Sequence, residues 1–375
     1  MKAGFFKTVT SSMVLASCLL GSYAFAASAG PALQKAKQEA DAKGFIFETS
    51  HDEIVARAKK EGLLRGLVGF EPQTIRALKE GFSRRYPFIN TQFEEITGPD
   101  SAQRFLLELK AGRASSWDIA HLSPDFHNDY LPFLEKIDLL GMARQGVLQI
   151  HSKMISPESR NAIAISSIVD LIAYNKKVVP QDKLPRTWDD LLKPEYKGRK
   201  FVMDIKPNSM SALVPSMGID WVLDYARKLA AQQPIWARGH TRYLTGMAEG
   251  EYALFVGTYY HSVMRLRQRG AKDLEVLILE PVPVRVTETH GIVKGASHPY
   301  SAVLFFEYVA GLEGQKILYE VEPFKSSIYS PGSKAEELVR GKRISVIDWQ
   351  HIVKQQEYMD KIFAAYGFPK AGGSK

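Results

Sequence analysis

The stretch from Gly250 to Val263, GEYALFVGTYYHSV, constrains the fold more than any other part of the chain. Its first part, Tyr252–Val256, is almost entirely apolar and favours extended structure, which predicts a strand buried on both faces. Gly257 is expected to end this strand, and Thr258 to cap a helix from Tyr259 to about Arg269. A doubly buried strand that turns directly into a helix is typical of an α/β sheet covered by helices.

Tyr259 and Tyr260 would therefore open a helix at the carboxyl end of a strand. Open α/β sheets bind ligands at this edge, where helix N-termini offer free N–H groups and positive potential. Two phenols there could hold a cation, stack on a ligand or simply pack. Helical spacing supports packing for Tyr259, because it shares a face with Val263 and Leu266.

The N-terminus predicts export. Lys2 and Lys7 precede an apolar run that ends in Ala-Phe-Ala, which is typical of a secretory signal cleaved after Ala26. An alternative is lipid attachment at Cys18, within Leu-Ala-Ser-Cys, but ordinary cleavage accounts for more residues. Cys18 is the only cysteine, so the mature chain would contain no disulfide, thiolate nucleophile or cysteine metal ligand.

Composition limits the function classes. With 45% apolar residues, the chain can build two lobes that each bury a core. The net charge of +8 falls to about +6 once Lys2 and Lys7 are removed. The charges are interspersed, without the arginine-rich tracts of nucleic-acid-binding proteins. Mild basicity fits an anionic ligand, although it often serves only solubility.

The first half of the mature chain alternates strands and helices. We expect strands at Leu63–Phe70, Pro87–Ile96 and Trp117–Leu122. Helices lie between them in the prediction, the first beginning at Pro72. Such βα steps with short turns indicate a parallel sheet with right-handed crossovers.

Polar residues follow these strands at the edge where a ligand would bind. Glu71 ends the first strand, and His121 and Ser123 follow the third. Each has a plainer alternative: Glu71 could be an N-cap carboxylate stabilised by the helix dipole, and His121 an ordinary hydrogen-bonding group.

The second half contains two expected connections between lobes. Ile163–Tyr174 is apolar without polar alternation and is too long for one strand of a compact lobe, so it could cross as a hinge. Glu280–Thr287 would return the chain beside it. Between them, Asn208 and Ser209 start another helix after Pro207, which offers anion-binding N–H groups.

Catalytic motifs are missing from the sequence. There is no Gly-x-Ser-x-Gly elbow, no His-Glu-x-x-His, no phosphate loop and no dinucleotide glycine fingerprint. His261 could serve as a base, but no nucleophile accompanies it at a fixed spacing. We therefore expect no enzyme, and keep a secreted enzyme as a remote alternative.

Seven short segments share the order and spacing of one known family: Ala77–Pro87, Leu109–Arg113 before Trp117–Ile119, Ala173–Lys176, Trp188–Gly198, Gly250–Tyr252, Gly295–Pro299 and Glu313–Lys316. They resemble the periplasmic solute-binding proteins of ATP-driven importers, in particular the branch with ferric-ion-binding proteins. The resemblance runs from about Glu61 to Phe324. No single segment is diagnostic, but the set is.

The resemblance implies an α/β, two-lobed periplasmic-binding-protein fold of type II. Each lobe would be a mixed, mostly parallel sheet flanked by helices, with a hinge of crossing strands that closes on ligand. The implied protein is a periplasmic monomer that delivers its ligand to a membrane permease, without chemistry, a required cofactor or nucleic acid. The expected divisions are a signal peptide (1–26), a helical extension (27–60), lobe 1 (61–165), lobe 2 (166–280), a return to lobe 1 (281–330) and C-terminal helices (331–375).

The resemblance slightly favours ferric iron as the ligand. Ferric-binding members place consecutive tyrosines where Tyr259 and Tyr260 stand, and hard oxygen donors suit Fe³⁺. Glu71 would be the third donor, and a synergistic anion on Asn208 and Ser209 would complete the site.

The match to ferric-binding members is partial, which leaves an alternative open. Those members have a histidine where this chain has Glu71 and a carboxylate where it has Ser123. The same cleft could therefore bind a phosphorylated or carboxylated organic anion, and His121 and Asn175 complete the set of candidate ligand-binding residues.

Overall fold

A ten-stranded mixed sheet runs through the part of the chain that the structure, a computed structural model, describes: Met1 and residues 30–96, 98–114, 116–198, 201–321 and 325–368. Apart from Met1, the expected signal peptide lies outside these residues. The strand order is β2-β1-β3-β9-β4-β7-β5-β6, with β10 beside β9 and β8 beside β4. The strands are β1 (Leu63–Val68), β2 (Asn90–Glu95), β3 (Ile119–His121), β4 (Ala162–Asn175), β5 (Phe201–Asp204), β6 (Ile235–Ala237), β7 (Leu254–Tyr259), β8 (Leu274–Leu277), β9 (Val282–Ile292) and β10 (Ile344–Ile347).

Lobe 1 contains the parallel steps that the sequence predicts. β1 pairs in parallel with both β2 and β3, and α3 (Pro72–Arg85) and α4 (Gly98–Lys110) follow β1 and β2. The lobe is filled by α12 (Pro299–Ala310), whose residues from Ser301 onward are all buried. Gly311 separates α12 from α13 (Leu312–Val321), so the segment that begins at Pro299 forms two helices.

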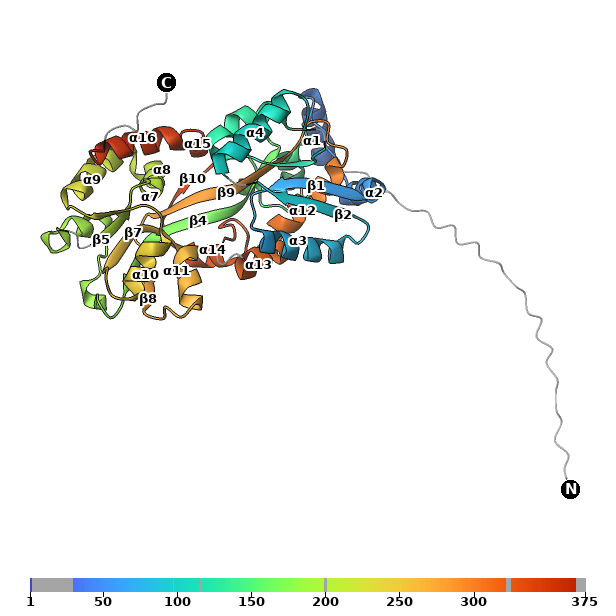
Figure 1. Cartoon of the computed structure of the whole chain (residues 1–375). Helices are drawn as coiled ribbons and strands as arrows, with labels where there is room; N and C mark the ends of the chain where they lie inside the picture. Colours follow the sequence, from blue (N-terminus) through green and yellow to red (C-terminus); the bar gives the residue numbers. More distant parts are fainter. Residues whose placement is uncertain (2–29, 97, 115, 199–200, 322–324, 369–375) are drawn as a thin grey trace.

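Lobe 2 is organised around β7, which lies between β4 and β5 (Figure 1). The expectation that Gly257 ends this strand is wrong: Gly257 has a φ of 79° and lies within β7. The ladder with β4 shifts register between Leu171 and Ile172, so the glycine occupies a bulge. The helix α11 (Tyr260–Gln268) consequently begins one residue later than predicted, with Tyr259 instead of Thr258 at the N-cap.

Two antiparallel strands form the hinge. β4 pairs with β9 from Ala162 to Val169 and with β7 and β8 from Asp170 onward. Figure 1 shows β4 and β9 side by side between the lobes. The prediction that the long apolar run and the returning segment are neighbouring crossings is confirmed.

The C-terminal region contains more than the expected helices. It forms α14 (Lys334–Val339), α15 (Trp349–Ile352) and α16 (Gln355–Ala365), but also β10, which pairs in parallel with β9. The four residues of β10 are too few to show a clear strand pattern. After β10 the chain reaches lobe 2, where α16 packs on α9 (Ile219–Ala231) (Figure 1).

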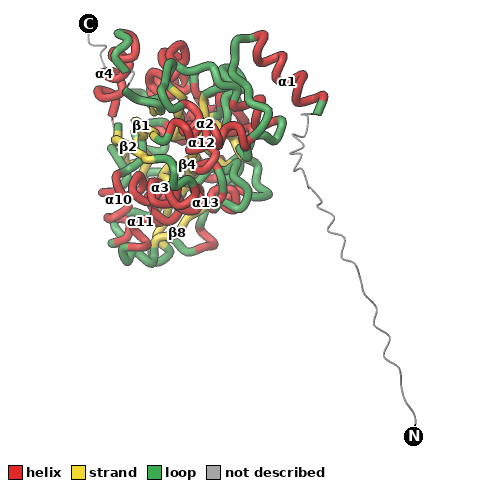
Figure 2. Tube along the Cα trace, turned by 90° about the vertical axis from the view of Figure 1, so that its right-hand side faces the viewer, coloured by secondary structure: helices red, strands yellow, loops and turns green. Residues whose placement is uncertain are grey.

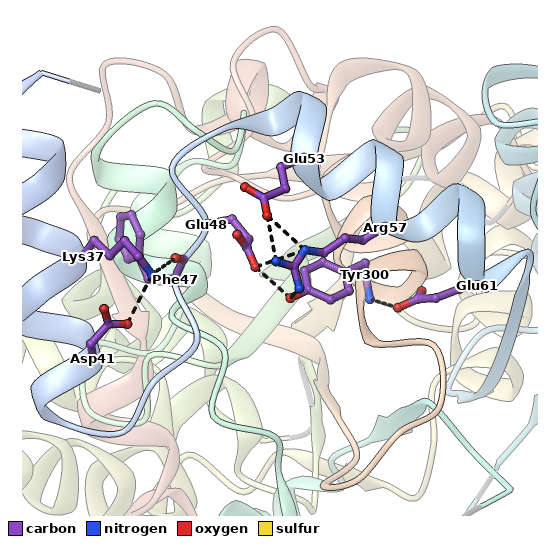
Figure 3. A network of polar contacts seen from close by, with 8 residues as sticks. All are labelled: Lys37, Asp41, Phe47, Glu48, Glu53, Arg57, Glu61 and Tyr300. Carbon is purple, nitrogen blue, oxygen red and sulfur yellow. Dashed lines mark hydrogen bonds and ion pairs between the residues drawn. The ribbon is translucent and has the colours of Figure 1, made fainter. Parts of the chain in front are cut away.

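The N-terminal extension is fixed to lobe 1 by polar contacts. It consists of α1 (Pro31–Ala42) and α2 (His51–Glu61), and α2 packs on α12, as Figure 2 also shows. Arg57 donates to the Tyr300 hydroxyl at 3.0 Å, and Glu61 accepts from the backbone N–H of Tyr300 at 3.1 Å (Figure 3). Glu61 therefore places a carboxylate at the N-terminus of α12, where the helix dipole stabilises it.

Candidate ligand-binding cleft

The two lobes meet at an ion pair. Glu71 is the N-cap of α3 in lobe 1, and its Oε1 lies 3.6 Å from Nη2 of Arg265, on α11 in lobe 2. Its Oε2 accepts a hydrogen bond from Gln73 at 3.1 Å. Glu71 thus occupies the N-cap position that the plainer alternative predicts, although its side chain makes no capping hydrogen bond to α3.

Tyr259 lies among polar groups where β7 ends. Its hydroxyl accepts a hydrogen bond from Nδ2 of Asn208 at 3.2 Å. Its ring stacks on His240 at a centroid distance of 4.1 Å, and the Arg285 guanidinium lies 5.1 Å from the ring centre. Burial raises the pKa of Tyr259 above 10, while the Arg285 charge opposes the rise. The phenol is therefore protonated at neutral pH and able to donate.

Tyr260 occupies different surroundings. It packs against two hydrophobic clusters, one containing Val263 and Phe255 and the other Val169 and Val282. Burial raises its pKa, and Tyr319 adds to the rise. The sequence favoured a packing role for Tyr259 on the basis of helical spacing. Because α11 begins one residue later than predicted, that packing role belongs to Tyr260 instead.

The floor of the site is a chain of charged and polar contacts. Arg285 on β9 pairs with Asp170 on β4 through Nε and Oδ2, 3.2 Å apart, and Asp170 is fully buried. His240 contacts Oδ2 of Asp204 at 3.0 Å and Oγ1 of Thr258 at 2.8 Å. Its imidazole is held between these partners, which fixes the ring beneath Tyr259.

A second polar cluster lies at the edge of lobe 1. His121, at the end of β3, is the ladder partner of His290 on β9, and its Nδ1 is 3.8 Å from Oε2 of Glu288. Lys325 lies 4.0 Å from the other oxygen of Glu288. Burial lowers the pKa of His121 to about 4, and the Lys325 charge contributes. Of these residues only His121 is predicted from the sequence; the signal for Glu288 and His290 was the run of polar residues from Thr287 to His290 within β9.

The other predicted residues lie in different parts of the two lobes. Asn208 contacts Tyr259, and the next residue, Ser209, is buried with an Oγ that has no hydrogen-bond partner among the described residues. Ser123 is also buried, at the start of a short 3₁₀ helix. Asn175 instead donates to the carbonyl of Met247 at 2.7 Å.

Asn175 is not close to Tyr259. The ladder partner of Tyr259 on β4 is Asp170, and five residues of strand correspond to about 16 Å. The side chain of Asn175 also accepts from the N–H of Lys177 at 2.9 Å. Its role in this structure is to fix the turn after β4.

Solved structures with a similar fold bind different ligands. Iron-bound HitA from Pseudomonas aeruginosa is 17% identical, with a TM-score of 0.60 over 82% of this chain and 99% of that chain. The Trichodesmium protein in complex with iron and citrate is 18% identical, with a TM-score of 0.61 over 82% and 100%. AfuA from Actinobacillus pleuropneumoniae, with bound fructose-6-phosphate, is 15% identical, with a TM-score of 0.50 over 82% and 98%.

Sequence comparison is more decisive for the family than for the ligand. No curated protein sequence matches the chain. Among the described residues, no helix combines the length and apolar character needed to cross a bilayer. A family model for bacterial extracellular solute-binding proteins matches residues 134–355, which include both hinge strands and all of lobe 2. The chain therefore belongs to the bacterial extracellular solute-binding protein family, with the type II periplasmic-binding-protein fold.

Proposed function

We propose that this protein is the periplasmic substrate-binding component of an ATP-driven importer and captures a small anionic solute between its lobes. Its family supports a binding role without catalysis. In this proposal the chain is exported by its N-terminal signal, acts as a monomer and delivers the solute to a membrane permease. The solute carries a carboxylate or a phosphate.

The hydrogen-bond donors around Tyr259 are the observation that supports an anionic ligand. The buried hydroxyl of Ser209 lacks a hydrogen-bond partner among the described residues, and the preceding residue, Asn208, donates to the protonated phenol of Tyr259. A carboxylate or phosphate accepts several hydrogen bonds at once and would satisfy these donors. Leaving a buried donor unsatisfied is costly, so the site gains by binding such a group.

Arg265 supplies a positive charge that the anion could pair with in place of Glu71. Its ion pair with Glu71 spans 3.6 Å between side chains that are 38% and 42% exposed. Exposed pairs of this kind contribute only about 0–1 kcal/mol. An incoming anion would replace Glu71 at little cost, whereas Arg285 remains paired with the buried Asp170.

Ferric iron is the second candidate, and the position of the tyrosine pair favours it. Tyr259 ends β7 and Tyr260 begins α11, and proteins of this fold include iron-bound examples. In this structure Tyr260 packs among apolar side chains and Glu71 pairs with Arg265. Coordination by all three would require Tyr260 and Glu71 to turn toward Tyr259, with a synergistic anion at Asn208 and Ser209.

Native mass spectrometry with metal analysis, on protein purified from its own host, distinguishes the candidates. We expect an organic ligand of defined mass without stoichiometric iron, and no visible band when ferric citrate is added to the stripped protein. A phenolate-to-iron charge-transfer band with one bound iron would overturn the organic anion. Turnover of the recovered solute would overturn the binding role.

A further inference from the structure

We propose that His121, Glu288 and His290 form a separate site for a divalent transition-metal ion such as Zn²⁺. One ligand atom from each residue lies within 4.8 Å of the other two. His121 and His290 are directly opposite each other in the β3–β9 ladder, with ring centroids 5.2 Å apart. The proposed function assigns the anion to Asn208, Ser209, Tyr259 and Arg265, none of which belongs to this site, so the site does not rest on the proposed function.

The hydrogen bonding of His290 leaves a nitrogen ready to bind metal. Nδ1 of His290 lies 2.9 Å from the backbone carbonyl of Glu288, so this nitrogen carries the proton and donates. Nε2 then has a free lone pair, and it is buried with no hydrogen-bond partner among the described residues. A backbone carbonyl that fixes the tautomer in this way is the usual outer-shell partner of a metal-binding histidine.

His121 shows the same lack of a hydrogen bond. Its Nδ1 is buried without a hydrogen-bond partner in the described part of the chain and faces Glu288 at 3.8 Å. Burial lowers the pKa of both imidazoles below its usual value, His121 to about 4.

The backbone brings Glu288 into this position. Glu288 has a φ of 51°, a region that residues other than glycine seldom occupy. In the bend that follows β1, a Cβ at Gly69 would lie 2.6 Å from Oε2 of Glu288 and 2.7 Å from Cε1 of His121. Only glycine leaves room for both side chains. Unusual backbone geometry that persists around polar groups often marks a functional site.

The donor set selects the class of metal. Two imidazoles and one carboxylate are a common Zn²⁺ set, with a further position open to water. Tetrahedral Zn²⁺ places its ligands about 3.4 Å apart, so the three side chains must draw closer than in this structure. His121 and Glu288 are partly exposed and can turn. Lys325, 4.0 Å from Glu288, would have to release the carboxylate.

Titration of the tag-free full-length protein with Co²⁺ and Zn²⁺ tests the site. Co²⁺ alone should bind one per chain, with visible d–d bands, and Zn²⁺ should displace it. His290→Gln and Glu288→Gln should each lose affinity by at least about 100-fold, since even an outer-shell change costs about 10–100-fold. His351→Ala is the matched control, because His351 forms another histidine–carboxylate pair with Asp348 at 2.7 Å, and it should bind Co²⁺ as the wild type does.

Two further variants keep the result interpretable. If His290→Gln does not fold, as judged by circular dichroism, the partly exposed His121→Gln replaces it. Tyr259→Phe should retain Co²⁺ binding, which separates this site from the anion site even if no anion is ever found. The proposal is overturned if the wild type gives no d–d bands, if the His121, Glu288 and His290 variants bind normally, or if His351→Ala abolishes binding.

Discussion

Arg285 on β9 and Asp170 on β4 form an ion pair inside the hinge, with Nε 3.2 Å from Oδ2. Asp170 is also the ladder partner of Tyr259, and the guanidinium of Arg285 lies over the Tyr259 ring. The two strands that join the lobes therefore hold the Tyr259 side chain in place. Bending of β4 against β9 would move Tyr259 directly, which links closure to the site.

Removing one partner of this pair should destabilise the protein strongly. Arg285→Met leaves Asp170 fully buried without its cation, and breaking a buried pair costs about 3–5 kcal/mol. Replacing both partners, as in Asp170→Leu with Arg285→Met, should recover most of that loss. Urea unfolding of the three proteins measures the difference. A single variant that loses less than about 1 kcal/mol would show that the pair is well solvated.

The ion pair between Glu71 and Arg265 should bias the protein toward the closed form. Glu71→Gln removes the charge that joins α3 to α11 but keeps the size of the side chain. We expect a larger radius of gyration in the absence of ligand and a change in unfolding free energy below about 1 kcal/mol. Small-angle scattering compares it with Glu53→Gln, whose pairing with Arg57 lies within α2. Equal radii for all three proteins would contradict a role in closure.

Several strands could be located from the sequence because each depends on a local pattern. Apolar runs between turn residues identified β1, β4 and β7, and the length of Ile163–Tyr174 identified the hinge. Gly257 was misjudged because its conformation is set by pairing with β4, which lies more than eighty residues earlier. β10 escaped detection because its partner, β9, is likewise distant in sequence.

The site was predicted less completely because its residues come from distant segments. Asn208 and Tyr259 were identified from strand ends and helix starts, and the structure joins them. Arg265 and Arg285 could not be found in this way. The sequence does not indicate which residue a charged side chain in a helix or strand will contact in the folded protein. The same limit applied to Asn175, which lies at a strand end but bonds to the backbone of Met247.

The two tyrosines should respond differently to loss of their hydroxyls. Tyr259→Phe removes a donor beside Asn208, and we expect solute affinity to fall by about tenfold, which corresponds to 1.4 kcal/mol. Tyr260→Phe keeps the apolar packing and should bind within about twofold of the wild type. Isothermal titration with the solute recovered from the host compares them. If Tyr260→Phe lost affinity equally and iron gave colour, the pair would act together on a metal.

The buried His127 should make the protein less stable in acid. The pKa of His127 is lowered by burial to about 4, its Nδ1 has no hydrogen-bond partner among the described residues, and its ring lies 5.8 Å from that of Trp349. In the unfolded chain the pKa of histidine is about 6.5. As pH falls from about 6.5 to 4, the unfolded state therefore binds a proton that the folded state does not, and the unfolding free energy decreases.

Between pH 7.5 and pH 5, His127 alone should lower the unfolding free energy of the wild type by about 2 kcal/mol. His127→Gln removes the titrating group, so its stability should fall by about 2 kcal/mol less over the same interval, whatever its stability at pH 7.5. Urea unfolding at both pH values gives the comparison. Equal losses of unfolding free energy in the two proteins would mean that His127 gains a proton without unfolding. The acid sensitivity would then belong to other buried groups such as His121 and His261, whose pKa values burial also lowers.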